Sequence, residues 1–221
     1  MLLSIVGACT TPQSKPALVE VAKVDPTIAF DIRYAGTDNF IGDVIDGYDS
    51  ATCMLTQEAA AALGDVQRAL RPKGLGLLVY DCYRPQRAVN EFVRWARDPK
   101  DQRQKAKYYP NVDKSELLPL GYLAQRSSHS RGSTVDLTLV RMSGPERGRP
   151  LDMGTDFDLF DPKSHTDASA VTSQQRANRR LLVDAMGRAG FVNLPVEWWH
   201  YTLRDEPYPD TYFDVVINNR Q

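Results

Sequence analysis

The chain has 221 residues, of which 42% are hydrophobic and 25% are charged, and its formal net charge is −1. This balance is typical of a soluble globular protein, and it gives no electrostatic reason to expect binding to nucleic acid or to an anionic membrane. No apolar run approaches the roughly 18 residues that a membrane-spanning helix needs. We therefore expect one globular domain over residues 18–221, with no nucleic-acid partner and no membrane span.

Residues 1–17 form a leader of different character. Its apolar stretch ends in Val6-Gly7-Ala8-Cys9, and Thr, Pro and Ser residues follow. This resembles the end of a bacterial lipoprotein signal, in which the cysteine carries the lipid, although the stretch is short and no Lys or Arg precedes it. The alternatives are a lipid anchor at Cys9 in the periplasm or cell envelope, and an incidental cysteine in the leader of a cytoplasmic protein.

The first half of the domain predicts short strands and two helices. Alternating residues at 19–34 indicate strands that are interrupted at a central Asp-Pro pair. Thr56 is a suitable N-cap for a helix that continues to Leu70. The apolar run at 75–82 is typical of a buried strand, and Pro85 then opens a second helix at a position where its missing N–H costs nothing.

The second half predicts a strand, a helix and a final strand-like segment. The charged stretch 101–120 indicates a surface excursion, and 133–140 alternates as a strand. A long loop is expected at 141–161. Thr172, with a glutamine three positions on, forms a capping-box pattern for a third helix, and 191–203 is again strand-like. This mixed order favours an α+β fold, with an antiparallel sheet and helices packed on one side of it.

Two of the three histidines lie in patterns that predict a metal site. His129 precedes Asp136 by seven positions, and His200 follows Glu197 by three, inside an aromatic run. Two histidines and one carboxylate are a standard ligand set for a catalytic Zn²⁺, and a further carboxylate beside them suits a general base. We therefore predict His129, Asp136 and His200 as zinc ligands and Glu197 as the base, whereas His165 is interpreted as an ordinary histidine.

This metal site makes two structural demands. The two motifs are far apart in the sequence, so neighbouring strands would have to bring them together. Side chains three apart on an ideal strand point to opposite faces, so the segment from Glu197 to His200 must turn or bulge for both to reach one metal.

The remaining cysteines, Cys53 and Cys82, are too far apart for the spacing of a CxxC zinc pair. We interpret them as two unrelated buried thiols. The alternative, in an exported protein, is a disulfide between them, for which the sequence supplies no geometry.

Two segments resemble the zinc motifs of one peptidase family. Ser-Ser-His-Ser-Arg-Gly-Ser-x-x-Asp-Leu-Thr-Leu at 127–139 and Glu-Trp-Trp-His-Tyr at 197–201 are similar to those of the VanX-type D-alanyl-D-alanine dipeptidases, which belong to the zinc D,D-peptidases. The resemblance implies one Zn²⁺ per chain, with the same three ligands and the same base. It extends over roughly residues 18 to 216 through shorter matches at 31–34, 46–48, 83–85, 153–154, 157–158 and 203–208.

The resemblance also implies roles for five further residues. Arg84 matches the arginine that stabilises the tetrahedral intermediate, and Asp158 matches a carboxylate that holds the free ammonium group of the substrate. Ser128, Tyr34 and Tyr48 match residues that line the substrate pocket.

The activity that this resemblance implies is hydrolysis of D-alanyl-D-alanine to two D-alanine molecules. In the envelope it would recycle peptidoglycan fragments, and inside the cell it would deplete the precursor that vancomycin recognises. A D,D-carboxypeptidase that trims longer peptidoglycan peptides is the first alternative. The second is a zinc-binding module without turnover, against which Glu197 and Arg84 argue because a binder needs neither. Cys82 departs from the pattern, since a small residue is expected before the Tyr-Arg-Pro turn. The sequence leaves the oligomeric state open.

Overall fold

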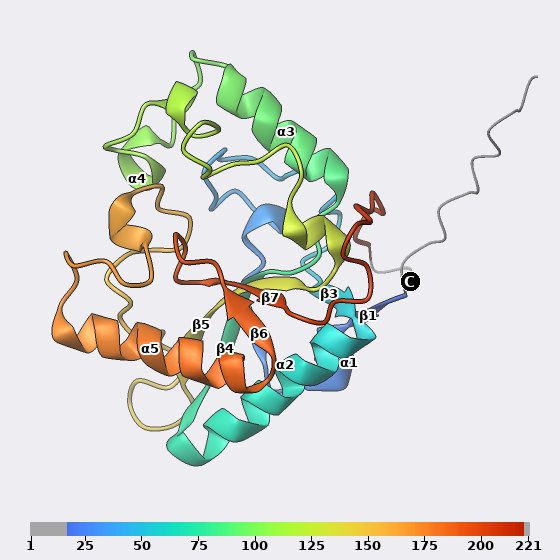
Figure 1. The fold of residues 1–221 in the computed structure, drawn as a ribbon, viewed down its shortest axis with the longest axis vertical. Coiled ribbons are helices and arrows are strands. Elements are labelled where there is room, and N and C mark those ends of the chain that lie inside the picture. The colour runs from blue at the N-terminus through green and yellow to red at the C-terminus, as the bar shows by residue number, and fades with distance from the viewer. Residues whose placement is uncertain (1–16, 219–221) are drawn as a thin grey trace, which may run out of the picture.

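The computed structural model describes residues 17–218, so the predicted lipid anchor at Cys9 lies outside the described residues. Its centre is a five-stranded sheet (Figure 1) made of β2 (Ala29–Phe30), β4 (Leu75–Asp81), β5 (Thr134–Arg141), β6 (Phe191–Asn193) and β7 (His200–Leu203). The strand order is β2-β4-β5-β7-β6. Every neighbouring pair is antiparallel except β2 and β4, which run parallel. The predicted α+β class and antiparallel sheet are confirmed, with this one parallel pair at an edge.

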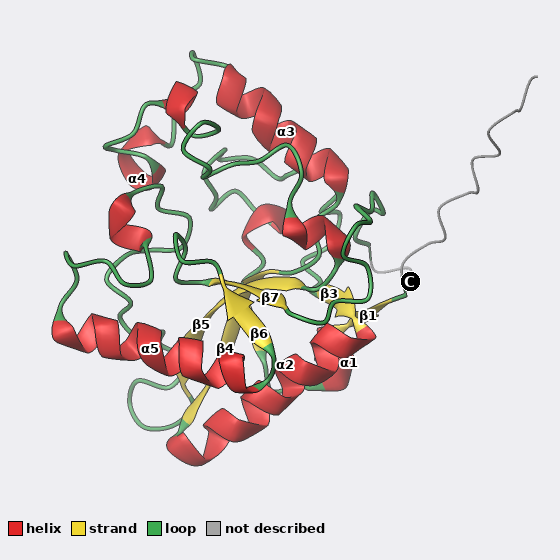
Figure 2. Cartoon of the chain, viewed as in Figure 1, coloured by secondary structure: helices red, strands yellow, loops and turns green. Residues whose placement is uncertain are grey.

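Helices lie on both sides of the sheet (Figure 2), rather than on one side as predicted. The two long helices α2 (Gln57–Leu70) and α5 (Ser173–Arg188) contact each other, and they contact β4 and β6 respectively. The third helix, α3 (Gln86–Arg97), lies away from α2 and α5, above the sheet in Figure 1. The space between the sheet and α3 holds the cavity described below.

The predicted helix starts agree with the structure to within one residue. The Thr56 hydroxyl accepts a hydrogen bond from the Ala59 amide, which satisfies one free donor of the first turn of α2. Thr172 forms the predicted capping box with Gln175 at the start of α5. Pro85 is the residue just before α3 rather than its first residue, because its backbone is still extended.

The N-terminal segment departs from the prediction of strands over residues 19–34. Strand β1 (Leu18–Glu20) pairs with β3 (Met54–Thr56) for three residues only, and the helical turn α1 (Val21–Val24) follows. The pairing is short because β3 itself continues directly into α2. Residues Arg33–Ala35 form a 3₁₀ turn in place of a strand.

The other expected irregular segments contain only short helical turns. The excursion 101–120 includes α4 (Lys105–Tyr108) and a 3₁₀ turn at Lys114–Glu116.

The stretch 191–203, predicted to be strand-like, forms two strands, β6 and β7, joined by a turn. Further 3₁₀ turns occupy Arg71–Lys73, Ser128–Arg131 and Pro162–Ser164.

The two remaining cysteines form a disulfide, so the interpretation of two separate thiols is wrong. Cys53 precedes β3 and Cys82 follows β4, and their Cα atoms are 5.3 Å apart. The backbone explains this proximity, because the Tyr83 amide donates to the Met54 carbonyl oxygen at 2.9 Å. The two chain segments therefore already lie side by side at this point.

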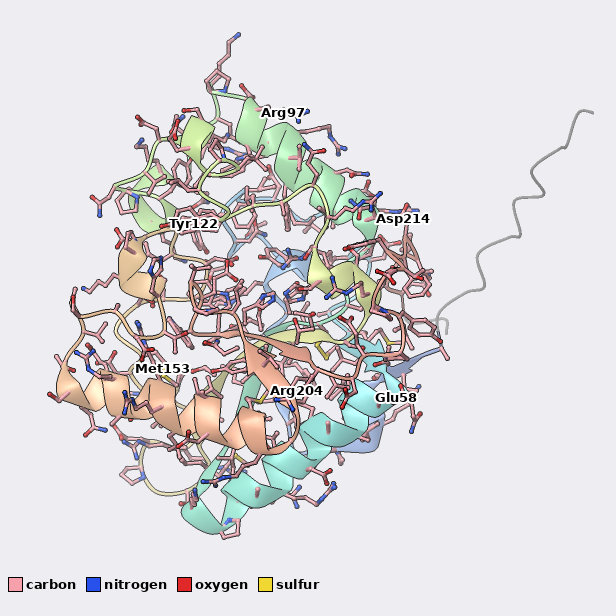
Figure 3. The ribbon with its side chains drawn as sticks, viewed as in Figure 1. Glu58, Arg97, Tyr122, Met153, Arg204 and Asp214 are labelled. Carbon is pink, nitrogen blue, oxygen red and sulfur yellow. A yellow bond between two sulfur atoms is a disulfide. The ribbon has the colours of Figure 1, made fainter. Side chains whose placement is uncertain are left out.

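Buried side chains fill the space between the sheet and the helices (Figure 3). The largest fully buried side chains include Trp199, Tyr201, Tyr34 and Phe92, and also the charged Arg179. Among the described residues, no helix has the length and apolar character needed to span a bilayer.

Candidate active site

The register between β5 and β7 brings the two predicted metal motifs together. Asp136 on β5 is paired directly with His200 on β7, and Asp136 Oδ1 lies 3.1 Å from His200 Nδ1. His129 lies in the 3₁₀ turn just before β5, with its Nε2 3.3 Å from Asp136 Oδ2 and 3.3 Å from His200 Nδ1. Neighbouring strands thus meet the first structural demand of the predicted site.

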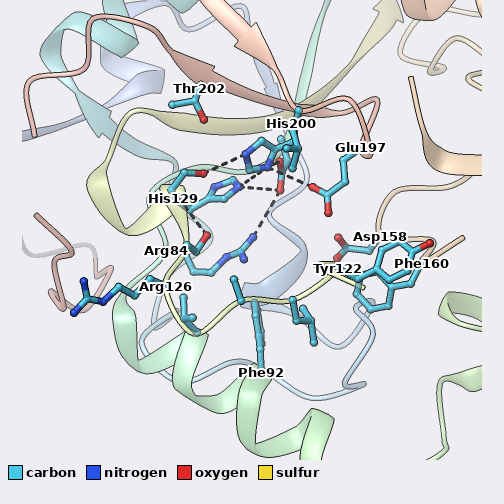
Figure 4. A pocket seen from close by; sticks show the side chains of 18 of the residues that line it. Arg84, Phe92, Tyr122, Arg126, His129, Asp158, Phe160, Glu197, His200 and Thr202 are labelled. Atoms are coloured by element: carbon cyan, nitrogen blue, oxygen red, sulfur yellow. Dashed lines mark hydrogen bonds and ion pairs between the residues drawn. The ribbon is translucent and has the colours of Figure 1, made fainter. Parts of the chain in front are cut away.

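The outer nitrogens of both histidines have partners of their own. His129 Nδ1 donates to the Cys82 carbonyl oxygen at 2.6 Å, and His200 Nε2 lies 3.2 Å from the Ser128 hydroxyl oxygen. These contacts turn His129 Nε2 and His200 Nδ1 toward each other (Figure 4). Both nitrogens also face the Asp136 carboxylate. Metal-binding histidines commonly use their second nitrogen in this way.

The spacing of the three side chains fits a tetrahedral zinc ion. Ligand atoms at about 2.0 to 2.2 Å from such an ion lie about 3.3 to 3.6 Å from one another. The distances between His129, Asp136 and His200 are close to these values. Asp136 Oδ1 is buried and makes no hydrogen bond of acceptable geometry, so it is an acceptor that a cation would satisfy.

The charges at this cluster reinforce one another. Burial alone would raise the pKa of Asp136, but the neighbouring His129 and His200 lower that pKa far below its usual range. For His200 the effects have opposite signs. Burial on its own lowers the pKa of His200, but the neighbouring Asp136 more than offsets this, so the pKa is raised. The cluster therefore keeps an ionised carboxylate in a buried position.

Glu197 reaches the cluster from the turn between β6 and β7. Its Oε2 lies 3.4 Å from His200 Nδ1, which meets the second structural demand. Asn193 holds this turn by donating to the carbonyl oxygens of both Glu197 and His200 at 3.0 Å. Burial raises the pKa of Glu197 to about 7, with His200 opposing and Asp136 adding to the shift. A carboxyl with this pKa can both accept and release a proton near neutral pH.

Arg84 lies beside the cluster, on the segment that follows β4. Its Nη2 is 2.7 Å from Asp81 Oδ2 and 3.7 Å from Asp136 Oδ2. The guanidinium lies over the rings of Tyr34 and Phe92, at 4.9 and 5.0 Å from their centroids. A buried permanent cation therefore faces the same space as the metal site.

Asp158 provides a third acidic group of the site, away from the His-Asp-His cluster. The Tyr34 hydroxyl donates to Asp158 Oδ2 at 2.8 Å, and the backbone φ of Asp158 is 61°. Burial raises the pKa of Asp158 well above its usual range, and the charge of Asp136 adds to the shift. A cationic group bound in the cavity would favour the ionised form of this carboxyl.

These groups surround one cavity of about 390 Å³, which is large enough for a small ligand. Figure 4 shows Glu197, His200 and His129 on one side of it and Asp158 near Tyr122 and Phe160 on another. Of the predicted site residues, Tyr48 does not line the cavity, because its hydroxyl is directed to Asp81. The predicted residues that line it are Tyr34, Arg84, Ser128, His129, Asp136, Asp158, Glu197 and His200.

A sequence model of the Peptidase_M15 family, described as D-ala-D-ala dipeptidase, matches residues 14–218. The chain belongs to the Peptidase_M15 family. Among similar proteins, the D-alanyl-D-alanine dipeptidase of Streptomyces coelicolor is 48% identical over 86% of this chain and 93% of its own length. The D-alanyl-D-alanine dipeptidases of Enterococcus faecalis and Enterococcus faecium are each 44% identical, with the same two coverages.

Sequence reasoning did not identify three features of this Peptidase_M15 site. Asp81 binds Arg84, Asn193 holds the turn that carries Glu197, and the disulfide of Cys82 lies behind His129. Asp81 had a local signal, because a charged residue at the end of an apolar strand run requires a partner. The other two depend on contacts between distant segments.

Proposed function

We propose that the chain is a zinc-dependent dipeptidase that hydrolyses D-alanyl-D-alanine to two D-alanine molecules. The observation that carries the proposal is a cavity with a His-Asp-His ligand set, a neighbouring glutamate and a separate buried carboxylate. Membership of the D-ala-D-ala dipeptidase family and the names of the relatives at 44–48% identity support the same substrate.

We infer that His129, Asp136 and His200 hold one Zn²⁺ per chain. When bound, zinc supplies a Lewis acid that lowers the pKa of a coordinated water to about 7 and polarises a carbonyl group. The Cys82 carbonyl and the Ser128 hydroxyl orient the two histidines for this purpose.

Glu197 is the proposed general base. It lies next to His200 and has a pKa near neutrality, so it can take a proton from the attacking water and return it to the departing amine. Arg84 is the proposed stabiliser of the negative charge that develops on the carbonyl oxygen of the scissile bond. Its charge is permanent and its site is largely dry, which makes the interaction stronger than in water.

Asp158 is the proposed partner of the substrate ammonium group. A free dipeptide is a zwitterion, so a closed site requires an acidic group for its amino terminus. Tyr34 holds Asp158 in place, and Ser128 lines the cavity near His200. A peptide extended beyond its amino terminus would lose the ammonium and place an amide against Asp158.

The proposal is tested by measuring D-alanine release from two substrates by the zinc-loaded protein. Release from D-alanyl-D-alanine, with little from a pentapeptide that ends in D-alanine, is the expected result. Release from the pentapeptide and not from the dipeptide would instead identify a D,D-carboxypeptidase and would contradict the role given to Asp158.

We also propose that the chain acts in the periplasm or elsewhere in the cell envelope. The disulfide between Cys53 and Cys82 supports this location, because disulfides form and persist in oxidising compartments. The lipid anchor at Cys9 stays a prediction, which mass spectrometry of the mature N-terminus would test.

A further inference from the structure

Asp81 is a fully buried carboxylate whose two oxygens are both engaged. It ends β4, three residues before Arg84. Its Oδ2 accepts hydrogen bonds from Arg84 Nε at 3.0 Å and Nη2 at 2.7 Å, and its Oδ1 accepts from the Tyr48 hydroxyl at 2.7 Å. A buried charge with this many donors is stable, whereas removal of one partner leaves an unpaired group at high cost.

These contacts fix the orientation of the Arg84 side chain. Two N–H groups point to one oxygen of Asp81, while Tyr34 and Phe92 lie against the guanidinium. Arg84 also lines the cavity, so its guanidinium faces the space that a ligand would occupy. A free arginine side chain has many rotamers, and fixing them in advance avoids an entropy cost in the reaction.

We propose that Asp81 is a positioning residue that holds the Arg84 guanidinium toward the carbonyl oxygen of the scissile bond. Tyr48 supports Asp81 in this task by donating its hydroxyl to Asp81 Oδ1. The inference rests on the proposed function, because it assigns Arg84 the charge that develops during hydrolysis.

The alternative route for Asp81 would be through the metal ligand His129. Asp81 Oδ2 is 3.5 Å from His129 Nδ1, but the Cys82 carbonyl oxygen is only 2.6 Å from the same nitrogen. The proton of His129 Nδ1 is therefore donated to the carbonyl. An effect of Asp81 on the reaction consequently passes through Arg84, and zinc binding should not depend on it.

The first test is Asp81→Asn, which keeps the volume and removes the charge. We expect kcat for D-alanyl-D-alanine to fall about 10- to 100-fold, because a misplaced donor loses much of the effect of a correctly placed one. KM should stay within about 3-fold, because the interaction with Arg84 strengthens mainly in the transition state. The zinc content should equal that of the wild type. Loss of zinc would overturn the proposal in favour of a role through His129.

A double-substitution cycle separates positioning from a general structural role. In an Arg84→Met background, adding Asp81→Asn should lower kcat by a further factor of less than about 3, because the arginine that Asp81 positions is already absent. Full additivity of the two losses would overturn the inference. If Asp81→Asn does not fold, Tyr48→Phe decides instead. Tyr48→Phe should lower kcat by about 3- to 10-fold in the otherwise wild-type protein and should have no further effect in the Arg84→Met background. An unchanged kcat in the single variant would overturn the inference.

Asp25→Asn is the matched control, since Asp25 is also a buried aspartate bonded to an arginine but does not line the cavity. Its kcat should equal that of the wild type, and a comparable loss there would overturn the specific role of Asp81. Different results contradict the proposed function and the role of Asp81. A wild type that does not cleave D-alanyl-D-alanine contradicts the proposed function, and the inference with it. An active wild type with an equally active Asp81→Asn variant contradicts only the inference.

Discussion

Asp136 and His200 occupy directly opposite positions on two antiparallel strands, with Asp136 Oδ1 3.1 Å from His200 Nδ1. A shift of one residue in this pairing would turn one of the two side chains to the other face of the sheet. The register of β5 and β7 is therefore a condition for the metal site, and the turn at 194–199 places Glu197 beside it.

Replacement of a ligand and of the base should have different consequences. His200→Ala should lose both bound zinc and activity, because one of three protein ligands is gone. Glu197→Ala should keep its zinc and lose activity by about 10²- to 10⁴-fold, the usual contribution of a general base. Zinc analysis and D-alanine release on the same preparations check both. Full activity in homogeneous Glu197→Ala protein would remove Glu197 from the mechanism.

Reduction of the disulfide should destabilise the protein without unfolding it at moderate temperature. The bridge joins residues 29 positions apart, and closing a loop of this length contributes about 3 to 4 kcal/mol. Urea unfolding with and without a reductant measures the difference. The double variant Cys53→Ser/Cys82→Ser should match the reduced wild type and should not respond to reductant. Equal midpoints in all four conditions would show that the bridge contributes nothing.

Arg179 should be needed both for stability and for substrate affinity. This fully buried arginine donates to the carbonyl oxygens of Met153, Lys163 and His165, which flank the segment that carries Asp158. Arg179→Met leaves these acceptors without donors and should cost about 2 to 5 kcal/mol.

The KM for the dipeptide should rise in Arg179→Met because Asp158 loses its support. Arg188→Met, at an exposed position of the same helix, is the control and should change neither quantity. An unchanged KM in a destabilised Arg179→Met protein would limit Arg179 to a purely structural role.

The ionised Asp25 carboxylate should contribute fully to the free energy of unfolding above about pH 4 and progressively less at lower pH. Burial raises its pKa, but hydrogen bonds from Thr27 and the charges of Arg71 and Arg68 outweigh this, so the pKa is lowered from its ordinary value of 3.8. An acid with a lowered pKa in the folded state stabilises the fold above its unfolded pKa, and this contribution is lost as the pH falls through the folded pKa.

Asp25→Asn should accordingly reduce the free energy of unfolding by about 1 to 3 kcal/mol at pH 7 and by progressively less below pH 4. Urea unfolding from pH 2 to 7 checks this, with Asp184→Asn at an exposed position of α5 as the control. A difference that stays constant down to pH 2 would contradict the assignment.

Local sequence patterns predicted the parts of the fold and site that depend on neighbouring residues. The caps at Thr56 and Thr172 depend on side chains within one helical turn, and the structure confirms both. The spacing of Glu197 and His200 required a turn, and the structure contains one. The two zinc motifs were recognisable because each keeps its ligands on a short segment.

Features that depend on distant contacts were not predictable in the same way. The alternation after Val19 indicated a longer strand, but its partner β3 offers only three residues before α2 begins. The pairing of Cys53 with Cys82 follows from β3 lying beside the segment after β4, which no local pattern reveals. Tyr48 was placed in the pocket by its motif alone, whereas its hydroxyl is bonded to Asp81 behind Arg84.

The most direct test of the account compares D-alanyl-D-alanine with its N-acetyl derivative as substrates of the zinc-loaded protein. The two differ only at the amino group, which is the group proposed to meet Asp158. The account predicts rapid release of D-alanine from the free dipeptide and at least about 100-fold less kcat/KM for the acetylated one, because a buried carboxylate is then left without its cation. Equal cleavage of both, or cleavage of neither, would contradict it.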